Sequence, residues 1–186
     1  FRSIDAFYRP SSFQTLVHQS PQIKLTLARN MGLTSGTGRI ATSDDPLRCA
    51  ILISGSGSGM EAMLEHQTRD DCCHATELVI SNKTGVLGIE RAENYSVPTY
   101  VIETPSGESK TQNRINHELL IEQKLVEYEI ELIILSGYMR LLSADFVARW
   151  GQKIVNIHPS LLPDFPGAHA HRDVIAAGVD ISGCTV

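Results

Sequence analysis

An asparagine and a histidine lie two residues apart at the end of a short apolar run, in the segment KIVNIHPSLLP. Side chains two residues apart in a strand point to the same side of the sheet, so Asn156 and His158 would lie together. An imidazole exchanges protons near neutral pH, and an amide can donate to a developing oxyanion. The pair predicts proton transfer beside an oxyanion, although a histidine at a strand end is also compatible with a surface or packed position.

A loop of alternating glycine and serine, Gly55 to Gly59, joins an apolar run to the start of a helix. Free backbone N–H groups at a helix N-terminus bind anions without any lysine, and a phosphate is the expected ligand. The third glycine comes too early for a dinucleotide-binding fingerprint, with Met60 in its place, and no Gly-Lys-Ser or Gly-Lys-Thr follows as in a P-loop. A tight turn without a ligand is the alternative.

Two further loops follow strands. Residues 137–142 bring aromatic, thioether and aliphatic side chains to the sheet edge, which suits a flat heterocyclic ligand, or else packing under a helix. Prolines at positions 159, 163 and 166 restrict the backbone that follows His158 and would hold this residue in place.

Apolar runs predict strands at residues 47–53, 77–81, 98–102, 131–136 and 153–157, with helix-sized segments between them. Helices are expected at 60–66 and 111–128. One further helix is expected to begin after Ser143, and another is expected to end at Gly178. In the long helix, Ile115, Leu119 and Val126 form the predicted apolar stripe. This alternation predicts an α/β fold with a doubly wound, mostly parallel sheet, and all three loops would meet at the carboxyl edge of its strands.

The net charge of -5 and pI near 5.8 argue against a nucleic-acid or anionic membrane partner. No apolar run approaches the roughly 20 residues that cross a bilayer. The four cysteines lack the spacing of a disulfide framework, which favours a reducing compartment. Neither Cys72-Cys73-His74 nor the pair His169 and His171 has the spacing of a structural zinc site, so no metal is expected.

Residues 1–46 differ from the rest: periodicity is weak, and Asp5 is the only acidic residue before Asp44. We expect an irregular leader, either a linker or an organelle transit peptide, since such peptides are rich in arginine and poor in acids. A cytoplasmic protein is the expectation, or an organellar one if the leader is a transit peptide.

Residues 47–186 closely resemble the phosphoribosylglycinamide formyltransferases in the runs ILISGSGSG, VISNK, LSGYMRLLS, KIVNIHPSLLP and GCTV. The resemblance implies a Rossmann-like formyltransferase domain that transfers a formyl group from 10-formyltetrahydrofolate to the amine of glycinamide ribonucleotide. The family pattern implies that His158 is the general acid/base and that Asn156 stabilises the oxyanion. The substrate phosphate would contact Gly57, Ser58, Gly59, Met60 and Glu61. The folate pocket would be lined by Arg114, Tyr138, Met139, Arg140, Leu141, Leu142 and Val147.

Two departures from the family pattern are expected to matter. Gly59 stands where the family usually has asparagine, which removes a side-chain donor but keeps the backbone cradle. The family's aspartate that orients the histidine is expected beyond Val186, so the domain is expected to be incomplete at its C-terminus.

Two alternatives remain open. Formyltetrahydrofolate deformylases use water in place of the amine, but they usually carry a second histidine where this chain has Pro159. A truncated copy that binds ligand without catalysis is the other alternative.

Overall fold

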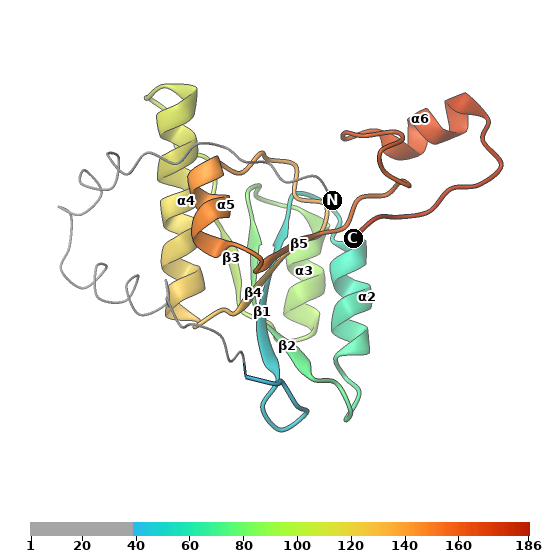
Figure 1. The fold of residues 1–186 in the computed structure, drawn as a ribbon. Helices are drawn as coiled ribbons and strands as arrows, with labels where there is room; N and C mark the ends of the chain where they lie inside the picture. The colour runs from blue at the N-terminus through green and yellow to red at the C-terminus, as the bar shows by residue number, and fades with distance from the viewer. Residues whose placement is uncertain (1–38) are drawn as a thin grey trace. The chain divides into compact units, whose positions relative to one another are not determined.

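The computed structural model describes residues 39–186, which contain a five-stranded sheet in the order β3-β2-β1-β4-β5 (Figure 1). All neighbouring strands are parallel. The strands are β1 (Leu47–Ile53), β2 (His74–Ser81), β3 (Thr99–Val101), β4 (Leu132–Leu135) and β5 (Ile154–Asn156). The helices are α2 (Ser58–His66), α3 (Leu87–Asn94), α4 (Lys110–Glu127), α5 (Ala144–Trp150) and α6 (Ala170–Ala177). The predicted α/β fold with a parallel sheet is confirmed.

The sheet has a hydrophobic core on each face, with α4 and α5 covering one face and α2 and α3 the other (Figure 1). Alternate residues of β1 supply the two cores: Ala50 and Leu52 face α4 and α5, whereas Cys49, Ile51 and Ile53 face α2 and α3. Side chains alternate between the faces of a strand, so a strand in the middle of such a sheet must be apolar at nearly every position. This explains the continuous apolar run of β1.

Two helix signals in the sequence correspond to observed caps. The Ser143 hydroxyl accepts the Phe146 N–H at 3.1 Å and caps α5, and Gly178 ends α6 in the left-handed conformation with φ of 62°. Helix α2 begins two residues earlier than predicted, at Ser58, directly after Gly57. The positive φ of Gly57, 67°, lets the chain turn sharply into the helix.

The predicted apolar stripe of α4 was wrong. Ile115, Leu119 and Val126 are only partly buried, and the buried face instead comprises His117, Glu118, Ile121, Glu122 and Leu125. Polar residues can be buried where they find partners, and both carboxylates on this face do. Glu118 accepts the N–H and hydroxyl of Ser143, and Glu122 forms two hydrogen bonds with Arg149 of α5, at 2.8 and 3.1 Å.

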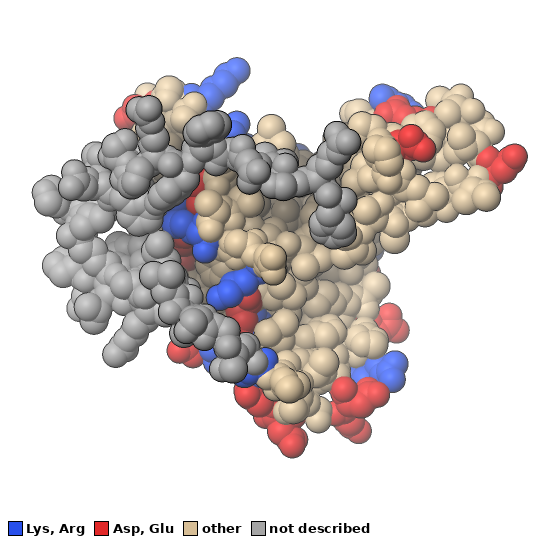
Figure 2. Space-filling model, in the orientation of Figure 1, with Lys and Arg blue, Asp and Glu red and all other residues tan. Residues whose placement is uncertain are grey.

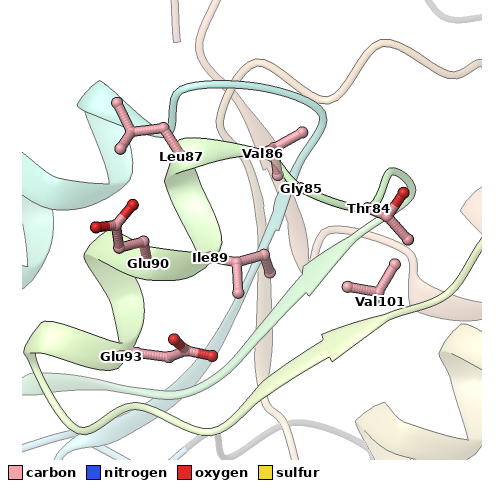
Figure 3. Close-up of a pocket in the computed structure, with 8 residues that line it drawn as sticks. All are labelled: Thr84, Gly85, Val86, Leu87, Ile89, Glu90, Glu93 and Val101. Carbon is pink, nitrogen blue, oxygen red and sulfur yellow. The ribbon is translucent and has the colours of Figure 1, made fainter.

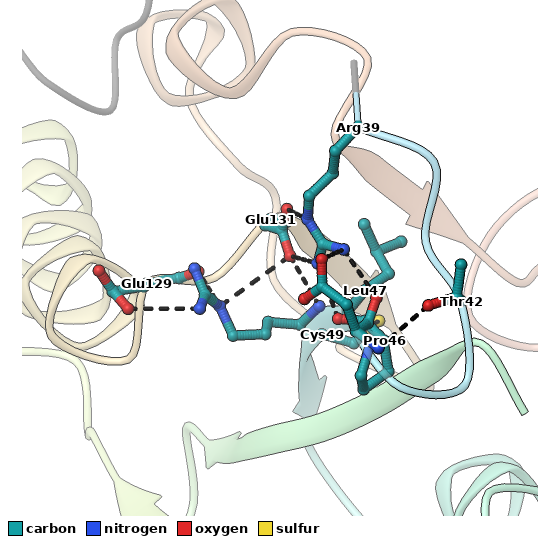
Figure 4. A network of polar contacts seen from close by, with 9 residues as sticks. Arg39, Thr42, Pro46, Leu47, Cys49, Glu129 and Glu131 are labelled. Carbon is teal, nitrogen blue, oxygen red and sulfur yellow. Dashed lines mark hydrogen bonds and ion pairs between the residues drawn. The ribbon is translucent and has the colours of Figure 1, made fainter.

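Arg39 joins residues 39–46 to the edge of the sheet where the strands begin, which we call the amino edge (Figure 4). Its guanidinium donates to both carboxylate oxygens of Glu131 and to the backbone carbonyls of Asp45 and Pro46, the latter two at 2.7 Å. Glu131 also accepts the Arg48 N–H at 3.0 Å. The predicted leader boundary at residue 46 stays a prediction, and most of that segment lies outside the described residues.

Charged side chains on the face seen in Figure 2 do not gather by sign: blue and red atoms lie beside one another along its lower edge and on α6. Ion pairs such as Arg69 with Asp71 and Arg172 with Asp173 account for part of this pattern. Among residues 39–186, no helix has the length and apolar character needed to cross a membrane.

Candidate active site

The three loops predicted to carry the site meet at the carboxyl edge of the sheet. From β1 the chain moves outward through β2 and β3, then crosses back to β4 and β5 on the other side of β1. The direction of strand order thus reverses between β1 and β4, and this reversal is the switch point of the sheet. Loops that leave the two strands in opposite directions open a crevice there, where ligands bind in open α/β sheets. The loops after β1, β4 and β5 surround this place.

The glycine loop after β1 packs too closely for side chains at two positions. A Cβ atom on Gly57 would lie 2.9 Å from the Cα of Gly88, and one on Gly59 would lie 2.8 Å from the Ser136 hydroxyl. The Gly88 N–H donates to the carbonyl of Gly55 at 3.2 Å, which ties this loop to α3. These two positions at the start of α2 therefore favour glycine, and Gly57 is buried whereas Gly59 is exposed. Backbone N–H groups at a helix N-terminus can bind an anion.

The residues predicted to contact the phosphate differ in exposure. Ser58 and Gly59 are exposed, whereas the side chain of Met60 is fully buried in the core under α2. Met60 can therefore offer a ligand only its backbone. Glu61, in the first turn of α2, is paired with Arg91 of α3 at 3.1 Å. This ion pair offsets the negative charge that Glu61 would otherwise place beside an anion.

Ser54, which the sequence reasoning missed, joins three loops. Its hydroxyl donates to Oδ1 of Asn82 after β2, at 2.5 Å, and accepts the Met139 N–H from the loop after β4, at 2.8 Å. Ser54, Asn82 and Met139 each follow a strand by one to four residues, and this common position is the signal that could have identified them. The network fixes the spacing of the loops across the switch point.

Tyr138, predicted to line a folate pocket, faces the core instead. It is 9% exposed, and its hydroxyl lies 3.0 Å from Nε2 of His117, a fully enclosed residue of α4. Burial raises the pKa of Tyr138 to about 12 and lowers the pKa of His117. The contact with His117 joins the loop after β4 to α4, and the predicted contact of Tyr138 with folate stays a prediction.

The other residues of the predicted folate surface are accessible to different degrees. Met139, Leu141 and Val147 are exposed, while Arg114, Arg140 and Leu142 are partly buried. An exposed thioether and aliphatic side chains beside the switch point form the kind of surface on which a flat heterocycle packs.

The ring of His158 is held by the loop that follows it. Its Nε2 lies 3.1 Å from the carbonyl oxygen of Phe165. A carbonyl only accepts, so Nε2 is the donor in this bond, and Nδ1 is the nitrogen that carries the lone pair in the neutral ring. The Ser160 hydroxyl donates to the carbonyls of Asp164 and Phe165, at 2.7 and 3.1 Å, and closes the loop on itself.

The backbone around His158 is paired on both sides. Its N–H and carbonyl exchange two 2.9 Å hydrogen bonds with Thr185 in an isolated antiparallel bridge. Asn156, the last residue of β5, pairs with Leu135 of β4 and is exposed at the edge of the sheet. The structure thus places Asn156 and His158 beside the loop after β4.

A separate hollow of about 560 Å³ lies between α3 and the ends of β2 and β3 (Figure 3). Its lining includes Val86, Ile89 and Val101 together with the carboxylates of Glu90 and Glu93. Two acids without a basic or amide partner do not suit an anionic substrate. None of the predicted site residues lines this hollow.

The chain belongs to the formyl transferase family, whose model matches residues 47–186. It is 43% identical over 149 residues to the trifunctional purine biosynthetic protein adenosine-3 of Gallus gallus, covering 80% of this chain and 14% of that protein. It is 39% identical over 137 residues to the phosphoribosylglycinamide formyltransferase of Bacillus subtilis, covering 74% of this chain and 68% of the relative.

Solved structures agree with this assignment. The chain matches a phosphoribosylglycinamide formyltransferase of Brucella melitensis with a TM-score of 0.69 and 38% sequence identity, over 75% of this chain and 71% of that one. The chain spans only about a seventh of the length of the trifunctional relatives that it matches. The predicted family and fold are thereby confirmed.

Proposed function

We propose that this domain transfers a formyl group from 10-formyltetrahydrofolate to the amine of glycinamide ribonucleotide. The observation that carries the proposal is the meeting of three loops at the switch point: a glycine cradle, an apolar surface and a histidine held at Nε2. The names of the relatives support the choice of substrates.

The glycine loop would bind the phosphate of the ribonucleotide through backbone N–H groups at the start of α2. The dipole of α2 adds partial positive charge at this end, which compensates for the absence of a lysine in the loop. Met139 and Leu141 would pack against the ring of the formyl donor. The two ligands would then meet in front of β4 and β5, where Asn156 and His158 lie.

His158 and Asn156 would carry the chemistry. The amine attacks the formyl carbon, and negative charge develops on the formyl oxygen. The bond between the formyl carbon and the folate nitrogen then breaks, and the attacking nitrogen loses a proton that the folate nitrogen gains. The Asn156 amide would donate to the oxygen, and the free Nδ1 of His158 would accept the proton. No metal ion is needed for these steps.

The test is tetrahydrofolate release from the full chain supplied with both substrates. We expect His158→Ala to slow release by about 100-fold or more and Asn156→Ala by a similar factor. His171→Ala, on the exposed α6, is the control and should leave the rate unchanged. If the parent chain bound the ribonucleotide but released no tetrahydrofolate, the result would contradict the transferase proposal and favour a binding-only role.

The same assay separates transfer from hydrolysis. A formyltransferase converts the ribonucleotide amine to a formamide and produces nothing when that substrate is omitted. If formate accumulated from the folate alone at the same rate, the domain would be a deformylase.

A further inference from the structure

Beyond the proposed function, we propose that His66, Cys72 and His74 form a binding site for a divalent transition-metal ion such as Zn²⁺. Their ligand atoms all lie within 4.8 Å of one another. Within residues 39–186 this is the one group of three or more histidine, cysteine or acidic side chains that converges in this way. It differs from the sequence-based expectation, which considered Cys72 and His74 without His66.

The site is built from the end of α2 and the start of β2, at the amino edge of the sheet and therefore opposite the candidate active site (Figure 1). His66 ends α2, and His74 begins β2 eight residues later. The two imidazole rings stack at 5.8 Å with an angle of 17° between their planes. The spacing of these residues in the sequence does not indicate a cluster, because they come together only through the turn that reverses the chain between α2 and β2.

The connecting turn is held in place by backbone hydrogen bonds. The Cys72 N–H donates to Arg69 at 3.1 Å, the Arg69 N–H donates to His66 at 3.3 Å, and the carbonyl of Cys73 accepts from Leu47 of β1 at 2.8 Å. These bonds bring the thiol and both rings together before any ion binds. Because the turn is fixed, ion binding would mainly require rotation of the three side chains.

The donor set is of the kind that selects Zn²⁺. Imidazole and thiolate are its preferred ligands, and three protein ligands leave a fourth tetrahedral position for water. Cys72 and His74 are partly buried and His66 is exposed, so an ion can reach the group from solvent.

The Gln67 side chain contacts one of the proposed metal ligands, His74. Its amide nitrogen lies 2.8 Å from Nδ1 of His74, and its amide oxygen accepts the Thr76 N–H at 3.1 Å. The amide nitrogen can only donate, so Nδ1 accepts this bond, and Gln67 holds the His74 ring at the start of β2.

The experiment is titration of the full, reduced chain with Co²⁺, which reports thiolate ligation by a charge-transfer absorption band. We expect one Co²⁺ per chain, displaced by Zn²⁺, with the band abolished in Cys72→Ser and in His66→Asn. Cys73→Ser removes the neighbouring exposed thiol and serves as the matched control, which should retain the band. Circular dichroism without metal verifies that each variant is folded.

Thermal unfolding provides the second measurement, since a ligand that binds only the folded state raises its stability. Added Zn²⁺ should raise the unfolding temperature of the parent chain and of Cys73→Ser, but not of Cys72→Ser. A band that survives in Cys72→Ser, or that is lost only in Cys73→Ser, would overturn the proposal. Because neither measurement uses the formyl-transfer assay, the outcome is independent of the proposed function.

Discussion

At the scale of single residues, His117 shows how a buried polar group can shape a site without reaching it. Its ring is 2% exposed, and its Nε2 meets the hydroxyl of Tyr138, whose neighbour Met139 is bound by Ser54. The loop after β4 is therefore held by His117 of α4 and by Ser54, which directly follows β1. A residue of this kind positions the loop, because it contacts the loop and not the expected ligand.

This pair makes the stability of the domain depend on pH. Burial lowers the pKa of His117 from 6.5, so as the pH falls below about 6.5 the unfolded chain takes up a proton that the folded chain does not. The contribution of His117 to the free energy of unfolding is fully present above that pH. It falls by up to about 1.4 kcal/mol per pH unit as the pH drops toward the lowered pKa.

We predict that the double variant His117→Phe/Tyr138→Phe has a shallower loss of stability between pH 6.5 and 5, measured by urea unfolding. The double change leaves no unpaired hydroxyl, whereas His117→Phe alone should cost about 1 to 3 kcal/mol at neutral pH. Tyr138→Phe alone keeps the titrating ring and is the matched control. An unchanged pH slope in the double variant would refute the role given to His117.

At the scale of elements, α4 and α5 are joined by polar side chains as well as by the core. Glu118 binds Ser143 at the start of α5, and Glu122 binds Arg149 in its last turn. Both carboxylates are almost completely buried, and each receives two hydrogen bonds. The two contacts fix α5, and with it Val147, relative to the loop after β4.

We expect Glu122→Ala to destabilise the domain by about 3 kcal/mol, because it leaves the Arg149 guanidinium without its partner in a largely buried position. Glu127→Ala, which breaks the exposed pair with Lys124 on the same helix, should cause little change in urea unfolding. If Glu122→Leu/Arg149→Met recovered most of the loss, the cost would lie in the unpaired charge. Equal effects of Glu122→Ala and Glu127→Ala would contradict this explanation.

At the scale of the whole described unit, the two edges of the sheet have separate roles. Loops at the carboxyl edge carry the candidate active site, whereas the amino edge holds the His66, Cys72 and His74 group and the Arg39 network. Glu131 is central to that network, since it accepts from Arg39 and from the backbone of Arg48. These bonds connect residues 39–46 to β1 and β4.

The Arg39 hydrogen bonds are the main reason that the pKa of Glu131 lies below its ordinary value of 4.5. A lowered carboxyl pKa contributes stability above about pH 4.5, and this contribution disappears as the pH falls through the folded pKa. We predict that Glu131→Gln is less stable than the parent at pH 7 and that the difference shrinks on acidification. Glu129→Gln, at a more exposed carboxylate, is the control, and a difference independent of pH would contradict the prediction.

The order of the elements, and the edge of the sheet at which the candidate site lies, could be predicted from the residue pattern alone. Apolar runs such as that of β1 must be buried on both faces, which requires a parallel sheet with helices on either side. Parallel strands place the loops that follow them at one edge, so the loops that carry Gly57, Met139 and His158 share the carboxyl edge of the sheet. Ser143 and Gly178 identified helix ends because caps depend on local backbone geometry alone.

The residue pattern did not reveal which side chains of the candidate site are exposed and which are buried in the core; that depends on the tertiary packing. Tyr138 and Met60 have residue types that suit a binding surface, yet both are buried, because the direction of a loop side chain depends on what packs against it. The polar face of α4 could not be predicted for the same reason: Glu118 and Glu122 are buried only because α5 brings their partners. His66 likewise meets Cys72 and His74 only after the chain has reversed between α2 and β2.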